Sequence, residues 1–244
     1  MAKMKHRRHA VNSINFQQAF TLIEVLVVIS IIAILTGLIS ALGAHSAAKR
    51  KIARAQAELQ QLEAVIENYK SKLGFYPPDN GAMTATDTNV DVLVASPNML
   101  TARTNQLLYE LTGTVLVQDN PPHYETLTSS EKLLYNDASK YFGRGFANSG
   151  SVRKGVKNFF TSLKSGQYKE LSSSGAGASP HIDVLTLPID GPNMLTNTTQ
   201  SSKVVLNTWR YNSSFPVNNP GSYDLWAEIT IDGKVLIIGN WNSY

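Results

Sequence analysis

Hydrophobic residues follow three patterns along this chain of 244 residues, and each predicts a different element. Val25 to Leu42 contains no charged residue, which is typical of a helix that crosses a membrane. From 44 to 73 apolar residues recur at alternating spacings of three and four, which predicts an amphipathic helix. The last third has short β-rich runs separated by turn residues, which predict strands. Together these patterns indicate an α+β protein.

The first two patterns are continuous. Between Phe20 and Leu73 the only weak points are Gly37 and Gly43, which membrane helices tolerate. We therefore predict one long helix that ends at Gly74 and Pro77-Pro78. Its stripe would pack on the chain's own sheet, with a coiled coil as the competing interpretation. The stripe consists of Ile52, Ala55, Leu59, Leu62, Ile66, Tyr69 and Leu73.

The middle of the chain predicts a long loop over 80–97 and three helices. The helices would cover 98–111, a segment from the capping box at 128–131 to Phe142, and 151–163. A Ser/Gly/Ala-rich connection follows at 172–179. We interpret this region as an inserted helical region, and its display outside a filament as a hypothesis for where specificity resides.

The C-terminal region predicts strands at 181–187 and 204–211 and a hairpin over 223–238. Asp232-Gly233 joins the two hairpin strands and suits a type I′ turn. We expect Trp209, Trp226 and Trp241 to bury large areas between the sheet and the helix.

Charge is concentrated at the N-terminus. The formal net charge is +4, and Lys3, Lys5, Arg7 and Arg8 precede Ala19 without any acid. Beyond Ala19, 18 basic residues face 18 acidic ones, so the basic balance belongs to a leader and no nucleic-acid partner is expected. The absence of cysteine excludes disulfides and thiolate metal sites.

The leader and the apolar segment meet at an unusual junction. A secretory signal peptide has its small residue after the apolar run, whereas Ala19 precedes it, so cleavage there leaves the helix attached. Glu24 is an acid at the start of the apolar run. It could pair with a freed Phe20 amine, of its own chain or of a neighbour, or be a first-turn acid that the helix dipole favours. The residues alone leave both open.

This junction resembles the type IV prepilin N-terminus shared by pilins and type II secretion pseudopilins. The matching features are the basic leader, a small residue and Phe20-Thr-Leu-Ile-Glu-Val-Leu-Val-Val-Ile29. The resemblance implies cleavage between Ala19 and Phe20 by prepilin peptidase, N-methylation of Phe20, and subunit registration by Glu24. It also implies a long N-terminal helix packed on a C-terminal antiparallel sheet. Ala19 departs from the glycine usual in the family.

A second resemblance, to the major G-type pseudopilin of type II secretion, lies near the end of the chain. Its residues are Trp209-Arg-Tyr211, Tyr223-Asp-Leu225 and Asn240-Trp241, together with Gly74-Phe-Tyr-Pro77 after the helix. That group commonly binds calcium in a Gly/Asp-rich loop, which is shortened here to 231–234. Asp224 and Asp232 alone supply too few oxygens for calcium, so we expect no metal or cofactor, with calcium at these two residues as the alternative.

These observations predict five regions and a structural role. The regions are a cleaved leader (1–19), a transmembrane half (20–43) and an amphipathic half (44–73) of one helix, a loop and helical insertion (74–180), and a C-terminal β region (181–244). Catalytic and nucleotide motifs such as HExxH, GxSxG and GxxxxGK[ST] do not occur in the sequence, so no enzyme is expected.

The predicted function is that of a pseudopilin subunit of a periplasmic type II secretion filament. Four basic residues flank each side of the apolar segment, and the first cluster together with the resemblance favours a cytoplasmic N-terminus in the inner membrane. Its partners would be prepilin peptidase, other subunits, the inner-membrane assembly platform and lipid. The alternatives are a surface type IV pilin or minor pilin for adhesion, motility or DNA uptake, and a membrane-tethered binding or enzymatic domain.

Overall fold

The structure is a computed structural model. It describes residues 21–79, 105–128, 132–142, 145–171, 182–192, 195–199 and 202–241. The leader with Ala19, Phe20, the loop at 80–97 and the connection at 172–179 therefore lie outside the described residues. The chain divides into two compact units, Met1–Ala47 and Ala48–Tyr244, which are described separately.

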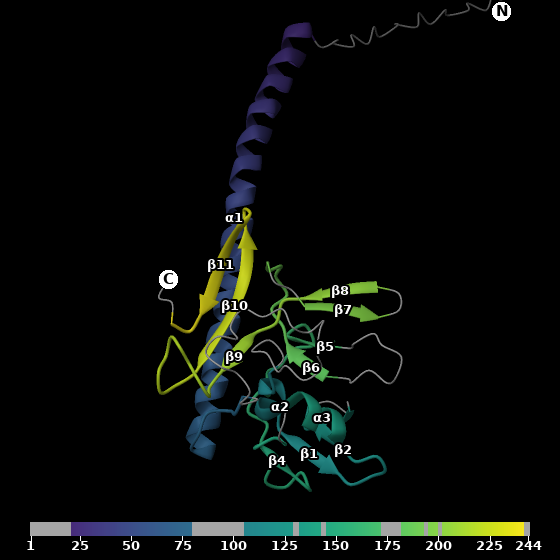
Figure 1. Cartoon of the computed structure of the whole chain (residues 1–244). Helices are drawn as coiled ribbons and strands as arrows, with labels where there is room; N and C mark the ends of the chain where they lie inside the picture. Colours follow the sequence, from purple (N-terminus) through teal and green to yellow (C-terminus); the bar gives the residue numbers. More distant parts are fainter. Residues whose placement is uncertain are drawn as a thin grey trace, which may run out of the picture. The chain divides into compact units, whose positions relative to one another are not determined.

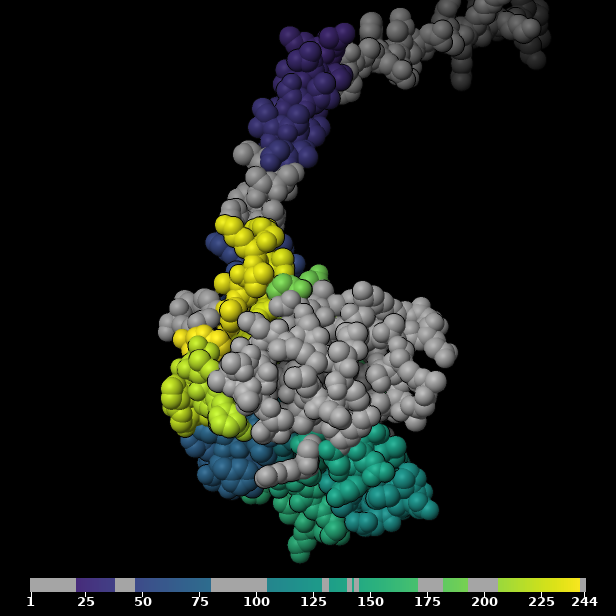
Figure 2. Space-filling view, in the orientation of Figure 1, coloured from purple at the N-terminus to yellow at the C-terminus, as the bar shows by residue number. Residues whose placement is uncertain are grey.

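A single helix, α1, runs from Leu22 to Leu73 and confirms the predicted long helix (Figure 1). In the first unit its large apolar side chains are exposed on every side, from Leu22 at 84% to Leu35 at 52%. We call this part of α1, residues 22–37, the apolar column, and Figure 2 shows it in purple. The hydroxyls of Ser30 and Thr36 donate to the carbonyls of Leu26 and Ile32, so hydroxyls on this apolar column have partners on the helix itself.

Within the described part of the chain, no helix combines the length and the apolar character needed to cross a membrane. The predicted transmembrane segment at 20–43 includes Phe20 and the side chains from 38 onward, which lie outside the description.

In the second unit, α1 presents the predicted stripe to a core. Ala55, Ile66 and Tyr69 are fully buried. They share one cluster with residues of the C-terminal strands, including Tyr211, Leu225 and Ile238. The stripe therefore packs on the chain's own domain, and the coiled-coil alternative is wrong for this face. The helix ends at Gly74, whose φ of +89° suits glycine and whose N–H donates to the Lys70 carbonyl at 2.8 Å.

The C-terminal strands form an antiparallel sheet in the order β11-β10-β9 (Figure 1). These strands are Lys234–Gly239, Asp224–Ile231 and Arg210–Asn212. Asp232 and Gly233, at φ of 50° and 75°, make the turn between β10 and β11, which confirms the predicted hairpin. Two smaller antiparallel pairs join β5 (Tyr168–Leu171) to β6 (Ile182–Leu185) and β7 (Leu195–Thr199) to β8 (Ser202–Leu206).

The middle region is mixed rather than helical. It contains two short helices, α2 (Leu107–Thr112) and α3 (Tyr135–Phe142), and a sheet in the order β3-β2-β1-β4. The strands of this sheet are β1 (Thr114–Val117), β2 (His123–Thr126), β3 (Lys132–Leu134) and β4 (Ser149–Gly150). The predicted helix from the capping box to Phe142 therefore begins only at Tyr135, and Ser129 to Glu131 of that box lie outside the described residues.

The predicted helix at 151–163 is wrong. This segment consists of turns and extended chain. Gly155 has a φ of +103°, which breaks a helix, and Asn158 Oδ1 accepts the N–H of Phe160 in a local turn. Phe159 and Phe160 instead donate their N–H groups to the Leu111 carbonyl. Local polar contacts therefore override an apolar spacing that resembles a helix.

The middle region shares a core with α1. Leu107, Leu111 and Phe160 are fully buried and belong to the same cluster as the α1 stripe. The middle region therefore supplies part of the core into which the α1 stripe packs.

The three tryptophans do not share one environment. Trp209 is buried in the α1 cluster, as predicted. Trp226 and Trp241 instead contact each other, with ring centroids 5.7 Å apart, in a separate small cluster. The expectation that these two rings lie between sheet and helix is therefore wrong.

Glu110 joins α1, α2 and the segment before β4 through its fully buried carboxylate. Oε1 accepts from Gln106 Nε2 at 3.0 Å and from Ala147 N at 2.7 Å. Oε2 accepts from the Tyr69 hydroxyl and from Asn148 N, both at 2.9 Å. Burial raises the pKa of Glu110, and the backbone N–H groups of Asn148 and Ala147 oppose that rise. Four donors thus offset the cost of burying this acid.

The variant Glu110→Gln tests this network. Its amide NH₂ would face donors in place of an oxygen, which leaves buried donors unpaired. We expect the free energy of unfolding to fall by about 2–3 kcal/mol, measured by chemical denaturation of the detergent-solubilised chain. The control Asp119→Asn changes an exposed acid in the same way and should leave stability unchanged. Equal stability of both variants would show that Glu110 is not a structural hub.

Candidate functional site

The first turn of α1 holds Glu24 in a capping box with Thr21. Thr21 donates its backbone N–H and its hydroxyl to Glu24 Oε2, at 2.8 and 2.7 Å. In return, the Glu24 N–H donates to Thr21 Oγ1 at 3.3 Å. This reciprocal pair satisfies backbone donors that a helix start otherwise leaves without partners.

The capping box gives Glu24 a role within its own chain. It is also compatible with the predicted pairing of Glu24 with a Phe20 amine. Only Oε2 is occupied, and within the described residues Oε1 accepts no hydrogen bond. Glu24 is exposed, so Oε1 is open to a further donor. Of the two interpretations of this acid, the local one is thus observed, while the pairing with a Phe20 amine stays a prediction because Phe20 lies outside the described residues.

Thr21 is a site residue that the sequence interpretation missed. The signal was present, because Thr21-Leu-Ile-Glu24 is a Thr-x-x-Glu pattern directly before an apolar run. Ala19 and Phe20, the residues of the predicted cleavage and methylation, lie outside the described residues.

The residues of the second resemblance meet at the end of the sheet. The Asn240 side chain accepts the N–H of Leu225 at 3.0 Å and donates to the Tyr223 carbonyl at 2.9 Å. Its backbone N–H also donates to the Leu225 carbonyl at 3.1 Å. Asn240 thus extends the pairing of β11 with the start of β10, which gives these two motifs a joint structural role.

The two calcium candidates, Asp224 and Asp232, have structural roles in the fold. Asp224 Oδ2 accepts the N–H groups of Val217 and Asn218 at 2.7 and 2.9 Å, and Oδ1 accepts that of Asn219 at 2.9 Å. These donors occupy the oxygens that a cation would need. Asp232 is an exposed turn residue. In the part of the chain that the structure describes, no group of three or more metal-ligating side chains gathers.

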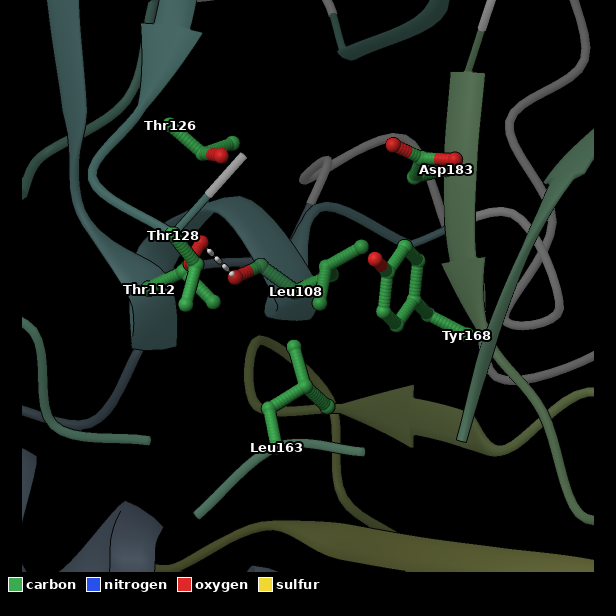
Figure 3. A pocket seen from close by; sticks show the side chains of 7 residues that line it. All are labelled: Leu108, Thr112, Thr126, Thr128, Leu163, Tyr168 and Asp183. Atoms are coloured by element: carbon green, nitrogen blue, oxygen red, sulfur yellow. Dashed lines mark hydrogen bonds between the residues drawn. The ribbon is translucent and has the colours of Figure 1, made fainter. Parts of the chain in front are cut away.

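A small cavity in the second unit is the other candidate site (Figure 3). Its volume of about 10 Å³ is that of a single water molecule. One wall is closed by α2, where the Thr112 hydroxyl donates to the Leu108 carbonyl at 2.8 Å. The cavity is too small for an organic substrate. Its lining consists of Leu108, Thr112, Thr126, Thr128, Leu163, Tyr168 and Asp183.

Replacing Thr21 tests the capping box. In Thr21→Ala the hydroxyl is lost and the helix start should fray, at a cost of about 1 kcal/mol. We expect the amides of Glu24 and Val25, which donate to Thr21, to exchange hydrogen about five- to tenfold faster, measured in detergent micelles by NMR. The control Ser30→Ala removes a hydroxyl within the helix and should leave those amides unchanged. Unaltered exchange in Thr21→Ala would rule out the cap.

Comparison with known proteins adds one finding. The family described as "Prokaryotic N-terminal methylation motif" matches residues 14–40, a range that contains Ala19, Phe20, Thr21 and Glu24. Neither a curated protein nor a solved structure matches the chain. The α+β architecture, with its long N-terminal helix and antiparallel sheets, is consistent with a pilin-like fold. The chain carries the prokaryotic N-terminal methylation motif, in agreement with a type IV pilin or pseudopilin-like protein that is a substrate of prepilin peptidase.

Proposed function

We propose that this chain is a structural, non-enzymatic pseudopilin subunit of type II secretion. Prepilin peptidase would cut between Ala19 and Phe20 and methylate the new amine. The inner-membrane assembly platform would then add the subunit, with others of its kind, to a periplasmic pseudopilus. The methylation motif at 14–40 supports the processing part of this proposal, because its range contains Ala19, Phe20 and Glu24.

The apolar first half of α1 supports a dual role as membrane anchor and filament core. Its side chains are exposed around the whole helix, which is costly in water and favourable in lipid. A helix holds all its backbone hydrogen bonds internally, so the segment at 20–43 could reside in the inner membrane with the N-terminus in the cytoplasm. The same apolar surface can pack against neighbouring helices once subunits leave the bilayer.

Glu24 would set the register of that packing. A carboxylate in an apolar environment is unfavourable by a few kcal/mol unless it is paired. Thr21 occupies Oε2, and Oε1 remains open to the Phe20 amine of a neighbouring subunit. Methylation leaves that amine cationic, so the pair would form only when subunits align correctly.

Features of the second unit favour a secretion pseudopilin over a surface pilin. Many surface pilins close a C-terminal loop with a disulfide, and this chain has no cysteine. Its end is instead held by Asn240 between Tyr223 and Leu225. Deletion of the gene in its native host should abolish protein secretion. Loss of surface pili with normal secretion would support a type IV pilin or minor pilin instead.

Variants of Glu24 test the assembly mechanism. We expect Glu24→Ala and Glu24→Val to remain in the membrane but to reduce filament formation at least about tenfold, because the register contact is lost. Filaments would be counted by electron microscopy after overexpression of the assembly system. The control Asp119→Asn, an exposed acid in the second unit, should assemble normally. Normal filaments from the Glu24 variants would refute this role.

A further inference from the structure

A cluster of four cations lies on α1 between the apolar column and the buried stripe. It consists of Lys49, Arg50, Lys51 and Arg54, and all four side chains are exposed. One acid lies within the next turn, Glu58, and its Oε1 accepts from Arg54 Nε at 3.2 Å. Within the described residues Lys49 and Lys51 form no ion pair. With four cations against this one acid, the cluster carries a net positive charge.

The four side chains of the cluster are exposed although the helix that carries them enters the core. Ala55, Leu59 and Leu62 mark the side of α1 that is buried in the core. At about 100° per residue, 49, 50 and 54 point away from that side, whereas Lys51 lies in line with Ala55 and Leu62 and is nevertheless exposed. The chain's own sheet thus leaves these cations accessible to a partner outside the domain.

The position of the cluster in the sequence identifies that partner. The uncharged run ends at Leu42, and Lys49 follows seven residues later, about 10 Å further along a helix. Phosphate headgroups occupy a layer that begins where the hydrocarbon core of a bilayer ends and is several Å deep. Long Lys and Arg side chains reach back toward such a layer while their stems lie on apolar surface. Lys and Arg are usually in excess on the cytoplasmic side of a membrane segment, whereas these four would lie on the exported side. An anionic partner there would offset their charge.

We propose that Lys49, Arg50, Lys51 and Arg54 bind the headgroups of anionic phospholipids where α1 leaves the membrane. This inference rests on the membrane insertion in the proposed function. Opposite charge supplies the attraction, and each cation near an anionic surface contributes to it. The contact would hold the subunit at a fixed depth before assembly and would have to break when the subunit is extracted into a filament.

Quenching by lipid probes tests the proposal on the full chain. Because the chain has no cysteine, Ala53→Cys gives a single labelling site beside the cluster for a fluorophore. The labelled protein is reconstituted in phosphatidylcholine vesicles that contain 30 mol% phosphatidylglycerol. A shallow acyl-chain spin label is carried at equal mole fraction on either phosphatidylglycerol or phosphatidylcholine. We expect the phosphatidylglycerol probe to quench about two- to threefold more at low salt, and the excess to vanish in 0.5 M NaCl.

Two sets of substitutions separate the cluster from general charge. Changing Lys49, Arg50, Lys51 and Arg54 to Gln should abolish the excess while the protein still floats with the vesicles. The matched control changes four exposed cations elsewhere to Gln, and it should keep the excess. These control positions are Lys72, Arg153, Lys154 and Lys234.

Three outcomes would overturn the inference. Equal quenching by both probes in a protein that floats with the vesicles refutes lipid selectivity and leaves the proposed function intact. The excess quenching could also rise with protein density and not with phosphatidylglycerol content. That result would indicate that the cluster contacts acids of a second copy instead of lipid. Failure of the unmodified chain to float would contradict the proposed function as well.

Discussion

Burial of one stripe of α1 is the contact on which the second unit depends. Ile66 and Tyr69 pack with Leu107 and Phe160 from the middle region and with Tyr211 and Leu225 from the end of the chain. These side chains come from parts of the sequence that are far apart and share one core, so the chain from Ala48 onward forms one compact unit. The amphipathic half of the helix is therefore the scaffold of the domain as well as the continuation of the apolar column.

Buried carboxylates and amides join the segments that apolar packing alone would leave loosely connected. Asp79, just after α1, accepts the N–H groups of Ser213 and Ser214, both at 2.8 Å, and so ties the helix exit to the loop before β10. The Tyr211 hydroxyl adds a bond to the Pro77 carbonyl at 2.7 Å. Glu110 likewise joins α1 to the middle region, because its carboxylate accepts from Tyr69 and from Asn148. In each case N–H or O–H donors surround the acceptor, which limits the cost of its burial.

Elements with strong local signals could be predicted from the sequence. The uninterrupted apolar run and the stripe predicted α1, and Asp232-Gly233 predicted the hairpin. The middle region could not be predicted in this way, because Gly155 and the side chain of Asn158 override an apolar spacing that suits a helix. Glu110 was also missed, since its donors come from residues far apart in sequence. The cap at Thr21 and Glu24 was readable but overlooked.

In the proposed function the start of α1 lies first in the membrane and then among the helices of a filament. The capping box at Thr21 and Glu24 shapes that start, and the exposed apolar side chains that follow it favour lipid or neighbouring helices over water. Both functions depend on where the mature chain begins. Mass spectrometry of the protein isolated from membranes of its native host tests this most directly. The account predicts an N-terminus at Phe20 that carries one methyl group, whereas an intact leader, a different first residue or an unmethylated Phe20 would contradict it.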